Sequence, residues 1–385
     1  MRVLHLGKYY APYAGGIENF MLDLVDATHA RGIANAVLVH QSAATQAGFD
    51  DRLTEDKSEL LFRARSYGQL AYAPISPGFG LALSRMIRQF KPSLLHLHLP
   101  NTSAFWALLS PPARRIPWII HWHSDVVGPG LEKRLRLLYP FYRPFEQVVL
   151  GRARRVISTS PAYLQSSRAL EHWRDCTEVV PLGLEPARLD CPALPEPGPW
   201  RNPGHLRVLG VGRLARYKGF SDLIDAVAAV NNVELIIAGQ GPLWSTLQRQ
   251  VASSGAADRI TLAGSVDNKT RNQWLASCDL LALPSINRAE AFGLCLVEAM
   301  AVGKPSLTTT VPGSGMAWVV EHDKTGWLVA PGDRTGLIEQ LGHLERNRKQ
   351  VAAAGEQAQK AFGQRFHIDA VADRIVEIYR HVLTG

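Results

Sequence analysis

Short apolar runs alternate with segments of helical period along the whole chain. A short apolar run bounded by turn residues predicts a buried strand, and apolar residues three and four positions apart predict one face of an amphipathic helix. The predicted strands are 3–6, 36–40, 94–99, 118–122, 156–160, 206–210, 233–238, 260–262, 280–283, 305–309 and 326–329. The predicted helices are 17–31, 84–90, 104–109, 131–156, 221–230, 243–253, 269–277, 294–302, 333–345, 350–362 and 368–383. Strands that alternate with helices in this way favour parallel sheets covered on both faces.

The composition changes between residues 185 and 204. This segment holds Pro186, Pro192, Pro195, Pro197, Pro199 and Pro203. Proline lacks a backbone N–H and is excluded from helix interiors and central strands, so the segment is expected to be a linker. The predicted domains are therefore 1–184 and 205–363, which agrees with the two to three domains expected for 385 residues.

The charge of the chain favours an anionic partner. The sequence has 42 lysines and arginines against 34 acidic residues, a formal net charge of +8. It has no recognisable nucleic-acid motif, so no nucleic acid is expected as a partner. The four cysteines show no C-x-x-C spacing and fit a reducing compartment, and no apolar run reaches the length of a membrane span. These features predict a cytoplasmic protein.

Basic residues are concentrated between positions 131 and 156. They are Lys133, Arg134, Arg136, Arg143, Arg152, Arg154 and Arg155, with leucine, tyrosine and phenylalanine between them. This pattern fits a solvent-exposed helix face over an apolar stripe, and it equally fits a surface that binds anionic lipid headgroups. The second alternative would attach the protein peripherally to the inner face of the plasma membrane.

Two glutamates, Glu290 and Glu298, follow a predicted buried strand with seven residues between them. Glu290 falls in the loop at the carboxyl end of the strand, and Glu298 lies one to two turns into the next helix. At the start of that helix, Phe292, Gly293 and Leu294 present backbone N–H groups that can bind an anion. A phosphate held there would have a carboxylate on each side to accept hydrogen bonds from hydroxyls. This arrangement indicates a nucleotide-sugar site.

Three other loops are expected to contribute to the same chemistry. Gly15 and Gly16 precede the first predicted helix and allow close approach of a phosphate or a sugar. Arg213 and Lys218 lie in a strand-end loop of the second half, where both can reach a diphosphate. Gly241 follows the next strand of that half and is expected on the same rim of the sheet.

Residues 210–215 match G-x-G-x-x-A, the dinucleotide-binding fingerprint. In dinucleotide-binding folds the helix begins within that motif. Here Lys218 and Gly219 intervene, and Ser221 is the expected helix cap. An NAD-dependent oxidoreductase is therefore a disfavoured alternative.

Two histidine pairs end predicted strands. His96 and His98 end one strand, and His121 and His123 end or follow another. Alternate strand positions face the same way, so each pair could offer two ligands to zinc. Apart from Asp125, no nearby cysteine, aspartate or glutamate completes an obvious ligand set, so no metal is expected. A single polar histidine at a strand tip is favoured.

Taken together, these motifs resemble the retaining glycosyltransferases of family 4 over nearly the whole chain. The matching segments are 15–16, 123–125, 180–185, 212–219, 238–242, 290–298 and 325–333. The resemblance implies the α/β GT-B architecture, with two facing Rossmann-like domains and the active site in the cleft between them. It also implies that residues 364–385 cross back to the N-terminal domain.

The resemblance assigns roles to single residues. Glu290 would contact the donor sugar, Glu298 the ribose, and His123 would lie near the sugar. The implied phosphate and base contacts come from Arg213, Lys218, Phe292, Gly293, Leu294, Gly16 and Gly241. Members of the family typically need no divalent metal, because cationic side chains and a helix N-terminus stabilise the leaving charge. They retain the anomeric configuration and generally lack a placed nucleophile, so Glu290 is not assigned as one.

The His-Ser-Asp segment resembles bacterial polysaccharide mannosyl- and rhamnosyltransferases. GDP-mannose or a relative is therefore the favoured donor, a UDP-sugar is the alternative, and the acceptor is expected to be a glycan or lipid-linked saccharide in cell-surface polysaccharide synthesis. One departure concerns 311–318, where family members often have Gly-Gly-x-x-Glu, and this leaves the geometry of that loop open. A non-catalytic subunit that binds a sugar nucleotide is disfavoured, because the expected charged residues are all present.

Overall fold

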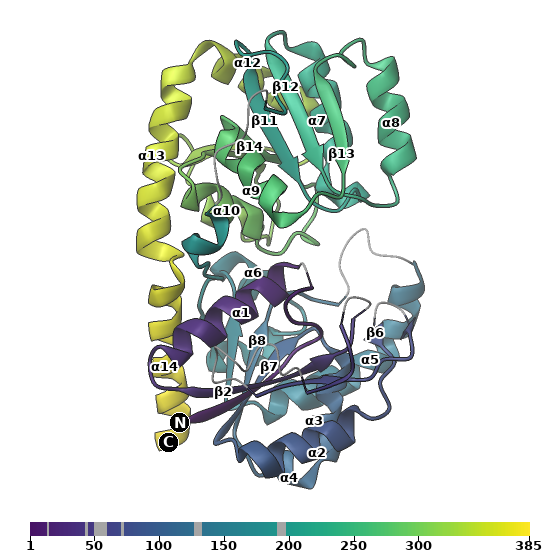
Figure 1. Ribbon diagram of the computed structural model, residues 1–385, viewed down its shortest axis with the longest axis vertical. Helices are drawn as coiled ribbons and strands as arrows, with labels where there is room; N and C mark the ends of the chain where they lie inside the picture. The colour runs from purple at the N-terminus through teal and green to yellow at the C-terminus, as the bar shows by residue number, and fades with distance from the viewer. Residues whose placement is uncertain (14, 43–44, 50–59, 71–72, 127–132, 191–197) are drawn as a thin grey trace. The chain divides into compact units, whose positions relative to one another are not determined.

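The computed structural model describes residues 1–13, 15–42, 45–49, 60–70, 73–126, 133–190 and 198–385. The chain forms two compact units (Figure 1). The first unit comprises Met1–Leu184 together with Ile368–Gly385, and the second comprises Glu185–His367. Each unit is built on its own largely parallel sheet.

The sheet of the first unit has the strand order β10-β9-β8-β7-β1-β2-β4-β3. Its strands are β1 (Arg2–Leu6), β2 (Ala34–His40), β3 (Gly48–Phe49), β4 (Leu60–Ala64), β7 (Leu94–Leu99), β8 (Trp118–Trp122), β9 (Arg155–Ser158) and β10 (Thr177–Val179). All pairs are parallel except β3 with β4. Both β7 and β8 are buried at every position, as expected for central parallel strands with both faces covered. A separate ribbon pairs β5 (Gln69–Leu70) with β6 (Ala73–Pro74).

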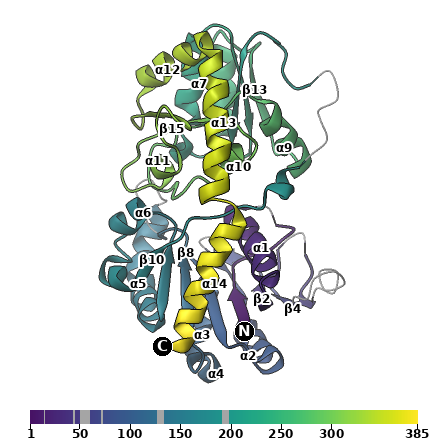
Figure 2. The same ribbon diagram turned by 90° about the vertical axis from the view of Figure 1, so that its left-hand side faces the viewer.

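The helices of the first unit include the last helix of the chain. They are α1 (Gly16–His29), α2 (Phe79–Phe90), α3 (Phe105–Leu109), α4 (Pro111–Arg114), α5 (Lys133–Arg152), α6 (Pro161–Ser166) and α14 (Ile368–Thr384). α14 packs beside α1 (Figure 2). Arg31 follows α1 and forms ion pairs of 3.0 Å with Asp369 and 2.6 Å with Asp373. These pairs fix the end of the chain to its first helix.

The sheet of the second unit is parallel throughout, in the order β13-β12-β11-β14-β15-β16. Its strands are β11 (Leu206–Val211), β12 (Val233–Ala238), β13 (Ile260–Gly264), β14 (Leu280–Leu283), β15 (Ser306–Thr309) and β16 (Gly326–Val329). Its helices are α7 (Phe220–Ala229), α8 (Trp244–Ser253), α9 (Asn268–Ser277), α10 (Leu294–Ala301), α11 (Met316–Val319), α12 (Arg334–Arg346) and α13 (Arg348–Arg365). None of the helices within the described ranges is both long and apolar enough to cross a membrane.

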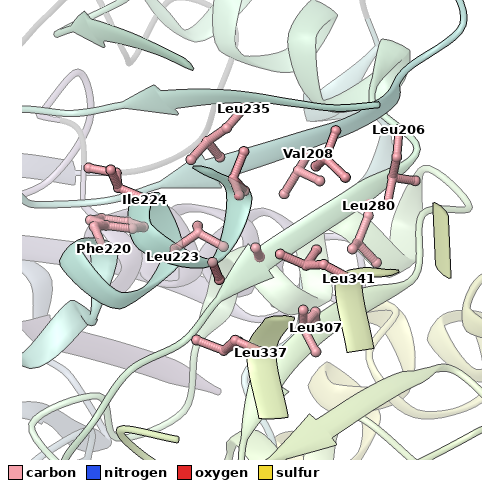
Figure 3. Close-up of a cluster of buried hydrophobic side chains, with 14 of the residues drawn as sticks. Leu206, Val208, Phe220, Leu223, Ile224, Leu235, Leu280, Leu307, Leu337 and Leu341 are labelled. Carbon is pink, nitrogen blue, oxygen red and sulfur yellow. The ribbon is translucent and has the colours of Figure 1, made fainter. Parts of the chain in front are cut away.

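Apolar side chains of α7 and α12 pack against the second sheet (Figure 3). Leu223 of α7 and Leu337 and Leu341 of α12 are buried in one cluster with Val208 of β11 and Leu280 of β14. Each such burial contributes about 1.5–3 kcal/mol relative to an exposed side chain. This core packs against β11 and β14, and the site loops emerge from the carboxyl ends of these two strands.

The structure confirms the predicted α/β fold class with two Rossmann-like units, and the differences concern the boundaries of elements and strands that were not expected. β4 was not expected, because residues 41–80 show no clear period, yet it pairs with β2 along five positions. α2 begins at Phe79 rather than at 84, since its first turn contains Gly80 and hides the helical pattern. The helix cap is Gly219 and not Ser221, whose hydroxyl instead bonds Gln250 at 2.9 Å.

The segment expected as a linker is partly fixed to the second unit. Trp200 donates to Ser277 at 2.9 Å, and the backbone N–H of Arg201 donates to Glu234 at 2.8 Å. A 3-10 turn, η4 (Pro186–Leu189), also belongs to that unit. Residues 191–197 lie outside the described residues. The expected boundary at 364 falls within α13, and the return to the first unit begins at Ile368.

Candidate functional site

A buried ion pair joins two loops of the second unit. Lys218 lies in the 3-10 turn η5 (Arg216–Lys218) after β11, and Glu290 lies in the loop after β14. The Lys218 Nζ atom is 2.5 Å from Glu290 Oε2, and their side chains are only 10% and 14% exposed. The loops are also tied through their backbones, because the N–H of Ile286 donates to the carbonyl of Tyr217 at 2.8 Å. The pair is therefore part of a fixed structure.

The negative charge of Glu290 favours the protonated form of Lys218. Burial lowers the pKa of the Lys218 ammonium, but the negative charge of Glu290 and the hydrogen bond to it outweigh this effect, and the pKa rises above its ordinary value. Lys218 is therefore a cation at neutral pH. Gly219 follows it with φ +69°, and a Cβ atom there would overlap the carbonyl oxygen of Pro284. A glycine is needed for the two loops to approach so closely.

The helix α10 begins beside Glu290. Its N-cap residue is Gly293, with φ +80°, and Phe292 before it is buried. The N–H groups of Leu294 and of the residue after it belong to the first turn, where a helix supplies no carbonyl partner. This end of the helix carries the positive end of the helix dipole. An anion bound here would lie next to the loop that holds Lys218 and Glu290.

Glu298 lies inside α10 and has a partner that the sequence did not reveal. It is 4% exposed, and Arg271 Nη1 of α9 lies 3.2 Å and 3.3 Å from its two carboxylate oxygens. A carboxylate offers about four acceptor positions, so Arg271 leaves room for hydroxyl donors. Arg271 stands in a polar helix without any motif, and no sequence pattern marks it.

The loops after β11 and β12 approach each other. The N–H of Leu214 donates to the carbonyl of Gln240 at 2.9 Å, and the N–H of Leu243 donates to the carbonyl of Leu214 at 3.0 Å. Gly241 lies between these contacts. Arg213 is exposed on the same loop as Leu214. The structure therefore places Arg213 and Gly241 on adjacent loops at the carboxyl ends of neighbouring strands.

The loop whose sequence departs from the family pattern holds the backbone of Glu290. The Ser314 hydroxyl donates to the carbonyl of Glu290 at 2.6 Å. The N–H of Gly315 donates to the carbonyl of Ala291 at 2.7 Å. Ser314 is 3% exposed and also accepts from the N–H of Met316 at 3.3 Å. Ser314 is thus a supporting residue of the site that sequence reasoning missed.

Gly15 and Gly16 lie at the N-terminus of α1 in the first unit. Gly15 is the N-cap residue, in an extended conformation, and Gly16 is the first residue of the helix. The carboxylate of Glu18 lies against Gly15. Burial raises the pKa of Glu18, while its own backbone N–H and the charge of Lys8 oppose the rise. The helix start that was expected to approach a diphosphate therefore has a carboxylate of its own beside it.

His123 follows β8 and is 4% exposed. Burial lowers its pKa to about 3, so the imidazole is neutral at physiological pH. Its ring stacks on His121 with the centroids 4.4 Å apart, and its Nε2 atom is 3.1 Å from His98 Nδ1. Instead of one polar histidine at a strand tip, the structure gathers a buried histidine cluster, which consists of His5, His96, His98, His121 and His123.

The cluster contains two sets of three histidines whose ring nitrogens lie within 4.8 Å of one another. The sets are His5, His96 and His98, and His98, His121 and His123. Neutral imidazoles are ligands for transition metals, so the donor set suits one chemically. Hydrogen bonds between three of these rings already use several of the nitrogens. The absence of a metal therefore stays a prediction.

The aspartate of the His-Ser-Asp segment supports the local structure. Asp125 accepts from the Trp122 indole at 2.9 Å and from the Ser167 hydroxyl at 2.6 Å. Its backbone N–H donates to the Tyr163 hydroxyl at 2.6 Å. These bonds hold the segment that follows β8, and His123 with it.

Two family models match the chain. Residues 15–183 match the glycosyl transferase 4-like domain, and residues 200–361 match glycosyl transferases group 1. The chain is 28% identical to D-rhamnosyltransferase WbpZ of Pseudomonas aeruginosa over 95% of this chain and 92% of that one. It is 28% identical to O-antigen chain mannosyltransferase C of Escherichia coli over 100% of this chain and 99% of that one.

Solved structures share the fold. Sucrose-phosphate synthase from Thermosynechococcus elongatus superposes with a TM-score of 0.79 at 20% identity, covering 100% of this chain and 99% of that chain. HepE of Anabaena, solved in complex with UDP-glucose, superposes with a TM-score of 0.73 at 22% identity, covering 99% of this chain and 100% of that chain. At these identities the likeness establishes the fold alone.

Proposed function

Because the chain belongs to the glycosyltransferases that these two family models describe, we propose that it transfers a hexose from a nucleoside-diphosphate sugar to a saccharide, with retention of the anomeric configuration. The observation that carries the proposal is the buried Lys218–Glu290 pair beside the start of α10. It places a permanent cation, a carboxylate and a helix N-terminus within one corner of the second unit.

This corner suits the leaving group. Lys218 is held in its charged form by Glu290, and Arg213 is exposed on the loop that follows the same strand. Together with the N–H groups of Phe292, Gly293 and Leu294, they stabilise the negative charge that develops on the diphosphate. Preorganised donors of this kind contribute most where charge forms in the transition state. No divalent metal is needed for that role.

The proposed reaction proceeds on one face of the sugar. The bond between the anomeric carbon and the diphosphate oxygen breaks, and its electron pair leaves with the diphosphate. The acceptor hydroxyl attacks from the same side, and its proton passes to the departing phosphate oxygen. Glu290 accepts hydrogen bonds from sugar hydroxyls, Glu298 accepts them from the ribose, and His123 contacts a sugar hydroxyl.

We propose a GDP-linked, mannose-like sugar as the donor. Two of the most similar relatives are named as a rhamnosyltransferase and an O-antigen mannosyltransferase. A UDP-sugar is the alternative, since HepE of similar fold was solved with UDP-glucose. The acceptor would be a growing glycan or a lipid-linked saccharide in cell-surface polysaccharide synthesis.

The surface of α5 suits a lipid-linked acceptor. Leu137, Phe141, Phe145 and Val148 are exposed at spacings of four, four and three residues, so they lie along one face of the helix. Phe141 and Leu137 are each 75% exposed. Arg143 is exposed on the same helix. An apolar stripe with basic neighbours is typical of helices that lie in a membrane interface.

Vesicle binding tests this membrane proposal. A double variant, Phe141→Ser with Arg143→Glu, is compared with Leu81→Ser on α2, which removes an 80% exposed leucine from another surface. The wild type and Leu81→Ser are expected to sediment with vesicles that contain anionic lipid, and the double variant is expected to stay in solution. Equal sedimentation of all three proteins would remove the membrane proposal.

Release of the nucleoside diphosphate tests the transfer itself. The wild type is incubated with GDP-mannose or UDP-glucose and a mixture of glycan acceptors in the presence of a chelator. Lys218→Ala should lower the rate by about 100-fold, because it removes a charge that stabilises the leaving group. Lys324→Ala serves as the matched control, since that lysine is 61% exposed and pairs with Glu321. A Lys218→Ala variant with full activity would contradict the proposed site.

A further inference from the structure

Four side chains form a continuous series of hydrogen bonds that ends at His123. Asn35 Oδ1 lies 3.3 Å from His5 Nε2, and His5 Nδ1 lies 3.2 Å from His98 Nε2. His98 Nδ1 lies 3.1 Å from His123 Nε2. Asn35, His5 and His98 lie in β2, β1 and β7, and His123 directly follows β8; these four strands are neighbours in one sheet. Each imidazole in the middle of the series uses both of its nitrogens.

Asn35 determines which atom donates and which accepts in each hydrogen bond of the series. The amide nitrogen of Asn35 donates to the carbonyls of Val25 and Ile33 and to the Thr28 hydroxyl oxygen, at 3.1, 3.3 and 3.1 Å. The Thr28 hydroxyl itself donates to the carbonyl of Leu24 at 2.8 Å, so it acts as an acceptor for Asn35. Exchanging the amide atoms of Asn35 would place its oxygen against two carbonyl oxygens. The amide oxygen therefore faces His5 and requires a hydrogen on His5 Nε2.

A neutral imidazole carries one hydrogen, so a donor at one nitrogen makes the other nitrogen an acceptor. His5 donates from Nε2 to Asn35, and its Nδ1 must accept from His98 Nε2. His98 Nδ1 must then accept from His123 Nε2. The three rings are buried, and burial lowers the pKa of each of them, which keeps them neutral.

The series ends at an acceptor. Once His123 donates from Nε2, its Nδ1 atom carries a lone pair and no hydrogen. Nδ1 is buried and has no hydrogen-bond partner among the residues that the structure describes. Buried polar atoms are nearly always paired, and an exception calls for an explanation. A hydroxyl from a ligand would satisfy this atom, whereas a carbonyl or phosphate oxygen would not.

We infer that Asn35, His5 and His98 are positioning residues that fix His123 in its Nε2–H tautomer, so that Nδ1 accepts a hydrogen bond from a hydroxyl of a bound saccharide. The inference rests on the proposed function for the identity of that hydroxyl. The tautomer of His123 does not depend on the proposed function, because it follows from the hydrogen bonds within the first unit.

¹⁵N NMR of the full-length protein, labelled with ¹⁵N in its histidine rings, tests the tautomer of His123 directly. In a neutral imidazole, a nitrogen that carries hydrogen and one that carries only a lone pair have widely separated ¹⁵N shifts. We expect His5, His98 and His123 each to show hydrogen on Nε2 and none on Nδ1. A wild-type spectrum with the hydrogen of His123 on Nδ1 would overturn the inference, whatever the variants show.

Two variants separate the series from its surroundings. Asn35→Leu removes the acceptor that sets the direction, so a fraction of His123 should acquire hydrogen on Nδ1. His121→Phe is the control, because His121 stacks on His123 but neither of its nitrogens has a hydrogen-bond partner among the described residues. It should keep the wild-type form of His123. If His121→Phe changes that form as much as Asn35→Leu does, the series does not fix it.

The transfer rate then connects the ring form to catalysis. In Asn35→Leu the rate should fall in proportion to the fraction of His123 that has changed form, with KM for the donor within about twofold of wild type. His123→Ala distinguishes a failure of the proposed role of His123 from a failure of the inferred tautomer. If it leaves the rate unchanged, the proposed role of His123 is wrong even when the ring form is as inferred. If the wild-type ring form differs, the inference is wrong even when the rate falls.

Discussion

Acid should destabilise the protein through the buried histidine cluster and through His40, a further buried histidine, and the structure gives the size of the effect. Burial lowers the pKa of His5 and of His40 to about 4, and that of His123 to about 3. In the unfolded chain a histidine has its ordinary pKa of 6.5. Between pH 6.5 and 4 the unfolded state therefore binds more protons than the folded state. The stability that these neutral rings contribute is complete above pH 6.5 and is lost as the pH falls.

The magnitude follows from proton linkage. Each of these three histidines should lower the free energy of unfolding by about 2 kcal/mol between about pH 7.5 and pH 5, or about 6 kcal/mol together if they act independently. His96, His98 and His121 act in the same direction, since burial holds their pKa values well below the ordinary value.

Glu146 opposes this loss. Burial raises its pKa to about 7, so the folded state binds a proton that the unfolded state releases between pH 4.5 and 7. Protonation of Glu146 should therefore return about 2 kcal/mol over the same interval. The net loss from His5, His40 and His123 is about 4 kcal/mol, a large part of the total of about 5–15 kcal/mol that is typical of folded proteins.

Urea unfolding measured at several pH values checks this result. The transition midpoint should fall steadily below pH 6.5, and His121→Phe should reduce the fall, because it removes one ring whose pKa burial holds well below its ordinary value. A free energy of unfolding that stays constant between pH 7.5 and 5, or a fall that begins only below pH 4.5, would refute the reasoning. The second result would assign the transition to carboxylates.

Three substitutions test single features of the structure. Gly219→Ala should lower the free energy of unfolding in urea by more than Gly255→Ala does. Both glycines have positive φ, but only at Gly219 does a carbonyl oxygen lie where the new methyl group would be placed. Equal losses would mean that the loops adjust freely. Ser314→Ala should cost about 1 kcal/mol of stability and lower the transfer rate, because the Glu290 carbonyl loses its donor; an unchanged rate would separate Ser314 from the site. Arg31→Ala removes two ion pairs to α14 and should lower the free energy of unfolding by only about 1 kcal/mol, because both aspartate partners are exposed. High salt should have the same effect on the wild type but not on the variant.

The sequence predicted the strands better than the contacts between them. β14 is a continuous apolar run, and β12 is one apart from Glu234; their predicted bounds match the structure because buried parallel strands need no alternation. β4 escaped prediction, because its mixed sequence becomes a strand only through pairing with β2. The local sequence pattern therefore identifies those strands that consist mainly of apolar residues.

The candidate site was predictable where a motif names its residues. Lys218 and Glu290 were each expected near phosphate and sugar, but nothing in the sequence shows that they form an ion pair. Arg271 is 27 residues from Glu298 along the chain, and Ser314 is 24 residues from Glu290. Neither belongs to a motif, because tertiary packing alone brings them to their partners.

His5 shows the same limit in the first unit. A single histidine in a short apolar strand carries no functional pattern. It meets His98 because β1 lies beside β7 in the sheet, an order that strand periodicity does not specify. The two histidine pairs could be recognised from the sequence, whereas the series that joins them to Asn35 required the strand order.

Donor binding without metal is the most direct test of the central claim that the second unit carries a nucleotide-sugar site. Thermal unfolding of the wild type and Lys218→Ala is measured with GDP-mannose, UDP-glucose, UDP-N-acetylglucosamine and NAD in the presence of a chelator. At about 100 times its dissociation constant, the true donor should add about 3 kcal/mol of stability to the wild type, and much less to the variant. Stabilisation by NAD alone, or by one sugar nucleotide equally in both proteins, would contradict the account.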